Sequence, residues 1–206
     1  MTLEQQILQN LVSGITNGAI YALIALGFVA VYSVTGIIHF AQGEFVMLGA
    51  LLAVSLHRAG LPLAAAGAAA VAGAAVISGV FYRTAIYPAR WASVLTLIII
   101  TIGGALTVRG VALVLWGTFS YSLPAFTPGL PLRVAGAVIR LQSLWVVGSL
   151  LVTMVLLYLF FEHTVAGKAL RACAVNMFAA RLMGIHPPRA ALAAFVLSGA
   201  LGALAG

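Results

Sequence analysis

Acidic residues are almost missing from this 206-residue sequence. Three Asp and Glu stand against ten Lys and Arg, and charged residues make up only 6% of the chain. Soluble domains are about one quarter charged, so this inventory cannot cover a water-facing surface. Hydrophobic residues reach 64% and fall in long runs, which predicts an all-α, polytopic membrane protein. No basic helix interleaved with aromatic residues is present, which disfavours nucleic-acid binding.

Residues for catalysis and metal binding are equally scarce. The single Cys173 excludes an intramolecular disulfide and a multi-thiolate metal site, and we interpret it as a small apolar residue. No HExxH, GxSxG or Walker A motif occurs; the nearest phosphate-loop pattern, Gly167-Lys168, is followed by alanine. Four histidines lie at predicted span ends, too scattered for a metal site: His39, His57, His163 and His186. We therefore expect no enzyme activity, metal or bound cofactor in this chain.

The apolar runs predict six membrane spans, because about 20 apolar residues cross the hydrocarbon core. They lie near residues 11–34, 44–57, 63–82, 91–117 and 143–161, with a sixth starting near 190. The second is short, so it either begins below the membrane plane or is a broken helix. The fourth is long, with Gly103-Gly104 near its middle, and we expect it to tilt or bend. The sixth is still apolar at Gly206, so we expect the sequence to be a fragment.

Basic residues between the spans predict the orientation. The connections around 35–43, 83–90 and 162–189 hold six Lys and Arg, and the opposite connections hold three. The positive-inside rule then places the N-terminus outside and the 162–189 segment in the cytoplasm. Abundant small residues, including a GxxxG at Gly14 and Gly18, predict a closely packed bundle.

Two ionisable residues are predicted in or against the membrane. Glu44 opens the second helix on the cytoplasmic side, where it either rests on the positive end of the helix dipole, pairs with a basic neighbour or serves a gate. Arg109 lies some eight residues from the outer end of its span. Snorkelling or packing is favoured there over contact with a substrate carboxylate in an aqueous pathway. The candidates for the pathway or gate are Asn17, His39, Gln42, Glu44 and Arg109.

The segment 163–189 differs from the apolar runs around it. Apolar residues recur there at helical spacing and alternate with polar ones: Leu170, Ala174, Met177 and Phe178 against Lys168, Arg171 and Asn176. Gly184 and the following Pro187-Pro188 form a helix-stop signal. We predict a short amphipathic helix on the cytoplasmic side. It lies either in the lipid interface or, as favoured here, against a cytoplasmic partner.

Three stretches together resemble a known family. NGAIYALIALGFVAVYSVTGIIHFAQGEFVMLGA (Asn17–Ala50) closely resembles the first two spans of branched-chain amino-acid ABC importer permeases. Leu95–Gly117 is similar to that family's "TIG" span, and Thr164–Ile185 is similar to its cytoplasmic coupling segment. The three motifs occur in the family's order and resemble the leucine-type subunit most.

The resemblance implies one multi-pass permease domain over 1–206 in the inner cell membrane, with 163–189 as its coupling segment. It implies alternating access driven by two cytoplasmic ATPases that carry ATP and Mg, together with a second permease subunit and an extracytoplasmic binding protein. It assigns ATPase coupling to these residues: Gly167, Lys168, Arg171, Ala172, Asn176, Ala180 and Gly184.

Several alternatives stay open beside this prediction. Permeases for urea and other amides are close relatives of the family, so the substrate is less certain than transport. A stand-alone secondary transporter, an intramembrane enzyme using Glu44 and His39, and a purely structural membrane subunit are the other classes. The lack of a carboxylate near the bilayer midplane argues against an ion-coupled carrier.

Overall fold

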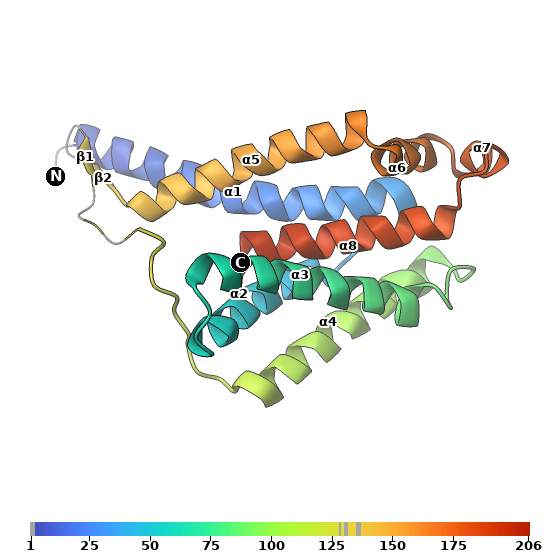
Figure 1. The fold of residues 1–206 in the computed structure, drawn as a ribbon, viewed down its shortest axis with the longest axis horizontal. Coiled ribbons are helices and arrows are strands. Elements are labelled where there is room, and N and C mark those ends of the chain that lie inside the picture. The colour runs from blue at the N-terminus through green and yellow to red at the C-terminus, as the bar shows by residue number, and fades with distance from the viewer. Residues whose placement is uncertain (1–2, 128, 130–131, 135–136) are drawn as a thin grey trace.

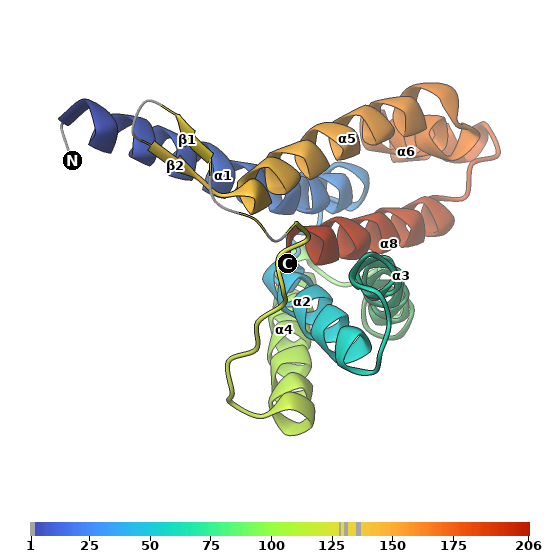
Figure 2. The same ribbon diagram turned by 60° about the vertical axis from the view of Figure 1, so that its left-hand side comes forward.

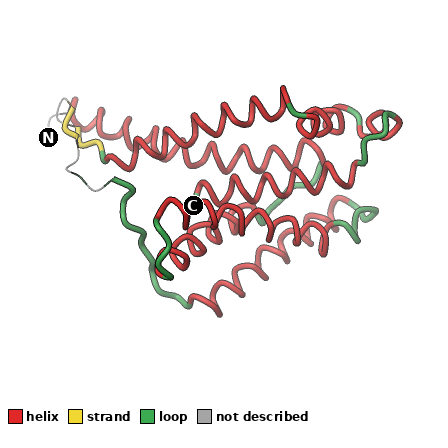
Figure 3. Tube along the Cα trace, in the orientation of Figure 1, coloured by secondary structure: helices red, strands yellow, loops and turns green. Residues whose placement is uncertain are grey.

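The computed structural model describes residues 3–127, 129, 132–134 and 137–206, and helices dominate it (Figure 1). Figure 3 shows how the loops join them. The helices are α1 (Leu3–Thr35), α2 (Gln42–Arg58), α3 (Leu63–Phe81), the π-helix η1 (Tyr82–Ile86), α4 (Val94–Trp116), α5 (Leu141–His163), α6 (Val165–Val175), α7 (Met177–Leu182) and α8 (Pro187–Ala205).

Five helices among the described residues are long and apolar enough to cross a membrane, which confirms the polytopic helical class. They are α1, α3 continued by η1, α4, α5 and α8. The remaining predicted span, α2, has only 17 residues, or about 25 Å of helix, and falls short of that length. The structure thus has five helices of spanning length and one shorter helix, α2, at the place where the sequence predicted a short second span.

The break before α2 begins at Gly36, which ends α1. Gly36 has a φ of +68°, and its N–H donates to the carbonyl oxygen of Tyr32 at 2.8 Å. A glycine in this left-handed conformation closes a helix and redirects the chain at no steric cost. Here it turns the chain back into the bundle.

The linker 36–41 then runs beside α8 instead of lying outside the bundle. Val34, at the end of α1, lies in one buried cluster with Ala190 of α8. Ile37 lies in another with Phe195, which is more than a turn further along the same helix. The chain between α1 and α2 is thus an irregular segment, followed by one continuous helix over Gln42–Arg58. Both alternatives for the short second span, a start below the membrane plane or a broken helix, stay predictions.

Helix α8 is the centre of the bundle, in contact with α1, α2 and α3 (Figure 2). Small residues permit this close approach: a Cβ added at Gly49 would overlap the backbone of Ala203, and one at Gly199 would overlap Ser78. The Ser78 hydroxyl donates to the Phe195 carbonyl oxygen at 2.6 Å. The predicted packing through small residues is therefore present, at α8 more than at the GxxxG of α1, where no atom lies within 4 Å of a Cβ placed at either glycine.

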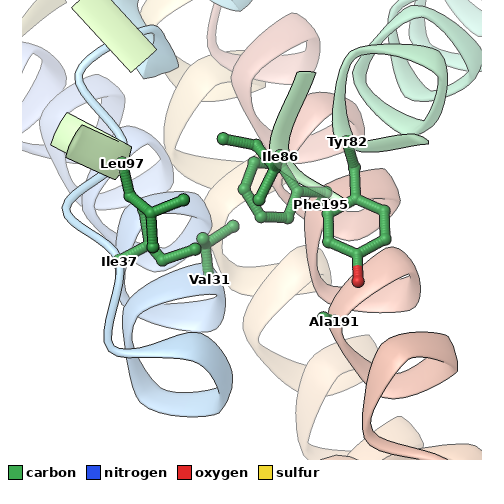
Figure 4. Packing of buried hydrophobic residues seen from close by; sticks show 7 residues of the cluster. All are labelled: Val31, Ile37, Tyr82, Ile86, Leu97, Ala191 and Phe195. Atoms are coloured by element: carbon green, nitrogen blue, oxygen red, sulfur yellow. The ribbon is translucent and has the colours of Figure 1, made fainter. Parts of the chain in front are cut away.

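One buried cluster ties the linker to four helices (Figure 4). Its members come from α1, the linker, η1, α4 and α8: Val31, Ile37, Tyr82, Ile86, Leu97, Ala191 and Phe195. The hydroxyl of Tyr82 also donates to the carbonyl oxygen of Pro188 at 3.1 Å. Apolar burial from several elements therefore holds the irregular segment in place.

Helix α4 passes through Gly103 and Gly104 without interruption. Gly104 serves close packing, because a Cβ there would overlap the ring of Phe81. The helix is therefore not broken at this pair, and the expected tilt or bend stays a prediction.

Two short strands were not anticipated. β1 (Leu132–Val134) and β2 (Ala137–Ile139) pair antiparallel beside the N-terminal part of α1. The Gln9 side chain accepts from the Val138 N–H at 2.8 Å and donates to the Val138 carbonyl oxygen at 3.3 Å.

Candidate transport site and coupling segment

Glu44 and Arg109 form an ion pair between α2 and α4. The Glu44 side chain is 9% exposed and that of Arg109 is 60% exposed. Glu44 lies in the first turn of α2, where the helix dipole also favours a carboxylate. Glu44 therefore both pairs with a basic neighbour and lies at the positive end of the helix dipole, as two of its three interpretations proposed. Its role in a gate stays a prediction.

The Arg109 side chain points toward Glu44 and not toward the nearer end of its helix, and it stays largely exposed at the side of the bundle. Trp116 Nε1 donates to Ser55 Oγ at 2.6 Å, which aligns the C-terminal parts of α4 and α2. Along each helix, Glu44 is eleven residues before Ser55 and Arg109 is seven before Trp116, or about 16 Å and about 10 Å. Helical side chains lean toward their N-terminus, and Arg109 follows that direction.

These positions correct two expectations. Of the two favoured alternatives for Arg109, snorkelling toward the end of α4 at Trp116 is wrong because its partner is Glu44, and packing against a neighbouring helix remains. Glu44 lies further from the ends of the long helices than a residue at the mouth of a span would, because α2 begins beside Ser198 of α8. The position of Glu44 was inferred from its short distance in sequence to the preceding loop. That inference failed because the six-residue linker folds into the bundle and not along its surface.

Gln42 joins three helices at the start of α2. Its side-chain N–H donates to the Ser198 carbonyl oxygen at 3.1 Å, and its carbonyl oxygen accepts from the Ser198 hydroxyl. A Cβ at Gly27 of α1 or at Gly202 of α8 would lie within 3.1 Å of the Gln42 amide nitrogen. The amide is thus held in a slot between α1 and α8, with both of its ends hydrogen bonded.

His39 lies in the linker, completely buried among aromatic rings. Its ring centroid is 4.8 Å from that of Phe195, 5.7 Å from Phe45 and 5.8 Å from Phe81. Neither ring nitrogen has a hydrogen-bond partner among the described residues. The expectation of a histidine at a span end is therefore wrong for His39, because the linker is inside the bundle.

Asn17 is not brought to this group. It is exposed on α1, fourteen residues before Val31 and thus about 21 Å of helix away from the linker region. The structure therefore brings together four of the five pathway or gate candidates around the start of α2 and leaves Asn17 apart.

The segment 163–189 contains two helices and not the single helix predicted. Asn176 separates α6 from α7 with an extended conformation, φ −157° and ψ 101°, and its side-chain oxygen accepts from the Ala179 N–H at 2.9 Å. An asparagine favours this N-cap position, so the residue interpreted as a polar interruption is a helix start. The predicted apolar stripe also fails: Leu170 is buried, whereas Phe178 is 72% exposed.

The residues assigned to ATPase coupling divide into two groups. Gly167 and Ala180 are buried, and a Cβ at Gly167 would overlap the backbone of Phe160, so these small residues shape the segment. Ala172 is half-buried. The exposed members are Lys168, Arg171, Asn176 and Gly184.

An apolar patch lies beside these exposed residues. It consists of side chains that are at least 70% exposed: Val175, Phe178, Leu182 and Met183. Arg171 is paired with Glu162 at 2.8 Å, with both side chains nearly half exposed. Cys173 faces inward, and burial raises the pKa of its thiol. The segment thus presents an apolar surface with basic residues beside it.

Two polar residues of the bundle were missed by sequence reasoning. Ser198 holds Gln42, and Thr101 of α4 holds the linker, with its hydroxyl oxygen accepting from the Phe40 N–H at 3.4 Å. Both hydroxyls are buried. A Ser beside Gly199 in an apolar helix is a weak signal of close packing. Thr101 is the first residue of the TIG motif (Thr101-Ile102-Gly103), but the motif did not indicate that the hydroxyl contacts the linker.

An ion pair between two helices of an otherwise apolar bundle is typical of proteins that move solutes across a membrane. The chain is a multi-pass membrane protein. Residues 10–206 match the model of a family described as the permease component of branched-chain amino acid transport systems. The chain belongs to this family, whose members are transport subunits and not enzymes.

Curated relatives agree with the family match. The chain is 30% identical to the high-affinity branched-chain amino acid transport system permease protein LivH of Escherichia coli (strain K12), over 97% of this chain and 69% of that protein. It is 30% identical to BraD of Pseudomonas aeruginosa, a permease of the same description, over 96% and 69%. A probable LivH of Methanocaldococcus jannaschii is 31% identical over 89% and 60%. No solved structure matches the chain.

Proposed function

We propose that this chain moves branched-chain amino acids as a permease subunit of an ABC importer that works by alternating access. The family match over residues 10–206 carries the proposal. The names of the relatives add the substrate class, since LivH and BraD are both branched-chain amino acid permeases. The first candidate for an alternative substrate is urea or a related amide.

The α6–α7 segment is the proposed ATPase contact. Its exposed apolar patch with basic residues beside it fits a protein partner, since large exposed apolar patches mark interaction sites. One residue, Thr164, separates α5 from α6, and a short turn joins α7 to α8. A displacement of the segment is therefore passed directly to α5 and α8.

The same displacement reaches the interior through α8. Ser198 of α8 holds Gln42, and Phe195 of α8 contacts His39. A tilt of α8 therefore moves the linker and the start of α2. Closure of the ATPases on ATP would in this way change access to the bundle interior, and the residues around the start of α2 are the proposed gate.

The proposed complex contains a second permease subunit, two cytoplasmic ATPases that bind ATP and Mg, and an extracytoplasmic binding protein. The α6–α7 end of the bundle faces the cytoplasm and the N-terminus lies outside, as the basic residues predict. The binding protein delivers substrate to the face opposite α6–α7.

Uptake by the assembled transporter tests the proposal. The chain is reconstituted in proteoliposomes with its second permease and ATPases, and uptake of labelled leucine and of labelled urea is measured with the corresponding binding protein. Leucine uptake that stops when ATP is omitted is the expected result. Uptake of urea but not of leucine would change the proposed substrate and leave the proposed mechanism intact. Uptake of either compound without ATP would overturn the ABC mechanism.

A further inference from the structure

The ion pair of Glu44 and Arg109 combines two features that a structural salt bridge in a membrane does not need. Its carboxylate is enclosed in the first turn of α2, and its guanidinium is largely exposed at the side of the bundle. A charged group in contact with lipid at this depth is costly, so it faces water or another protein. The α2–α4 face that carries the pair is therefore not a lipid-facing surface.

The depth of the pair supports this conclusion. Arg109 lies about 10 Å of helix inside the level of Trp116, and its side chain turns further inward to reach Glu44. An arginine at this distance from a membrane surface would ordinarily extend outward to water. Its direction toward Glu44 instead places a positive and a negative charge together on the α2–α4 face.

We propose that Glu44 and Arg109 bind the charged groups of the transported α-amino acid, the carboxylate at Arg109 and the ammonium at Glu44. This inference rests on the proposed function and names the residues that recognise its substrate class. A zwitterion carries one charge of each sign. On binding, Arg109 would exchange the Glu44 carboxylate for the substrate carboxylate, and Glu44 would exchange Arg109 for the substrate ammonium, so that no buried charge is left unpaired. A guanidinium binds a carboxylate through two parallel hydrogen bonds, which suits Arg109 to this role.

The surroundings of the pair fit the rest of such a substrate. On the α4 side, Ala105 and Val108 pack against the cluster of Ala41, Phe45 and Leu48. Ala105 is one turn before Arg109, beneath the direction in which the arginine side chain leans. The aliphatic side chain of a bound amino acid would thus contact apolar residues beside the two charges. A neutral amide such as urea carries no charged group that could pair with Glu44 or Arg109.

The test measures access to this face and protection by ligand. Ala105→Cys is introduced with Cys173→Ser, and the full transporter is placed in nanodiscs without its binding protein. Alkylation of the new cysteine by a charged, water-soluble maleimide is followed with leucine, leucinamide, 4-methylpentanoate or urea present. Leucinamide lacks the carboxylate and 4-methylpentanoate lacks the ammonium. Val108→Cys is the second reporter if Ala105→Cys does not assemble.

Leucine at about ten times its Kd occupies roughly nine-tenths of the sites by mass action and should slow alkylation about tenfold. The other three compounds should protect poorly. Arg109→Gln and Glu44→Gln should abolish protection by leucine, whereas Arg58→Gln should retain it, because Arg58 stacks on Tyr121 at the other end of α2.

Three results would overturn the proposal. A reporter cysteine that is not alkylated at either position shows that the face is packed against protein or lipid. Alkylation that leucine does not slow shows a water-filled face without the site. Equal protection by leucine and leucinamide removes Arg109 as the carboxylate partner. Leucine uptake by the unmodified transporter, measured in parallel, separates these failures from a failure of the proposed function.

Discussion

The chain contains two Arg–Glu ion pairs with the same chemistry in different surroundings. Glu44–Arg109 joins α2 to α4, and its carboxylate side chain is 9% exposed while its arginine side chain is 60% exposed. Glu162–Arg171 joins the end of α5 to α6, and its two side chains are 45% and 48% exposed. The first pair is 65 residues apart in sequence and the second is nine.

The difference shows which pair the fold depends on. Removing the cation of a buried carboxylate leaves that charge unpaired away from water and costs up to about 3–5 kcal/mol, and for Glu44–Arg109 the lower end applies because only the carboxylate is buried. An exposed pair contributes about 0–1 kcal/mol. Glu44–Arg109 is thus tied to stability, while Glu162–Arg171 leaves its arginine free to exchange partners. The predictions below sharpen this contrast, beginning with the largest loss of stability.

Arg109→Gln should destabilise the bundle most, by about 3 kcal/mol, because Glu44 remains enclosed without its cation. The value is at the lower end of the range since Arg109 itself is largely exposed. Denaturant unfolding of the purified chain in detergent measures it.

The double variant Glu44→Gln, Arg109→Gln is the control for this change. It removes both charges and should recover more than half of the loss, because no buried charge is left alone. A double variant as unstable as Arg109→Gln alone would show that the cost is lost packing and not an unpaired carboxylate.

Gly49→Ala should cost about 2 kcal/mol, because the new methyl group overlaps the Ala203 backbone of α8 and forces α2 and α8 apart. Gly43→Ala is its matched control in the same helix. No atom lies within 4 Å of a Cβ at Gly43, so there the gain in helix propensity should stabilise α2 by a few tenths to about 1 kcal/mol. Equal effects in the same unfolding assay would contradict the close contact of α2 with α8.

His39→Phe should stabilise the bundle by about 1 kcal/mol. It retains an aromatic ring against Phe195 and Phe45 while removing two buried nitrogens that have no partner among the described residues. The melting temperature in detergent should rise, and His39→Ala should lower it by leaving a cavity. A fall with phenylalanine would mean that the imidazole is hydrogen bonded.

Arg171→Glu should change stability least, by less than about 1 kcal/mol, because its pair with Glu162 is exposed. Its effect should appear instead in coupling: the proposed ATPase contact is reversed in charge, so ATP hydrolysis continues without uptake. Hydrolysis and leucine uptake are measured together in proteoliposomes.

The variant Glu162→Arg, Arg171→Glu separates the two roles of Arg171. It restores an opposite-charge pair within the chain but keeps the reversed charge at the docking surface, so it should remain uncoupled. Recovered coupling in this double variant would assign Arg171 to the internal pair, and wild-type coupling in Arg171→Glu alone would remove the residue from the ATPase contact.

Local patterns in the sequence predicted much of the fold. The span expected at 63–82 is α3 with its short π-helical extension, and the span expected at 143–161 lies within α5. These predictions succeed because the hydropathy of about 20 consecutive residues is a local property of the sequence and by itself decides whether a segment is apolar enough to cross the membrane. A short helical segment was also expected between α5 and α8, and α6 and α7 lie there; its role in coupling stays a prediction. Its division at Asn176 was missed, since an asparagine between helical residues resembles a polar position on one helix.

The candidate site was predicted as a set of residues but not as an arrangement. Glu44 and Arg109 were each singled out because a charge in an apolar run is costly wherever it lies. Their pairing, the burial of His39 and the role of Ser198 were not visible, because the partners are distant in sequence and ordinary residue types. Asn17, chosen in the same way, lies elsewhere.

The sequence by itself thus determined the class of protein, the positions of its long helices and its family, since composition, run length and motif order are properties of the chain alone. Only the tertiary structure decided the depth of α2 and hence the place of Glu44. That depth follows from the turn at Gly36, which directs the linker along α8, and from the small residues that let α8 approach α2. Neither effect exists until helices from both ends of the chain are packed together.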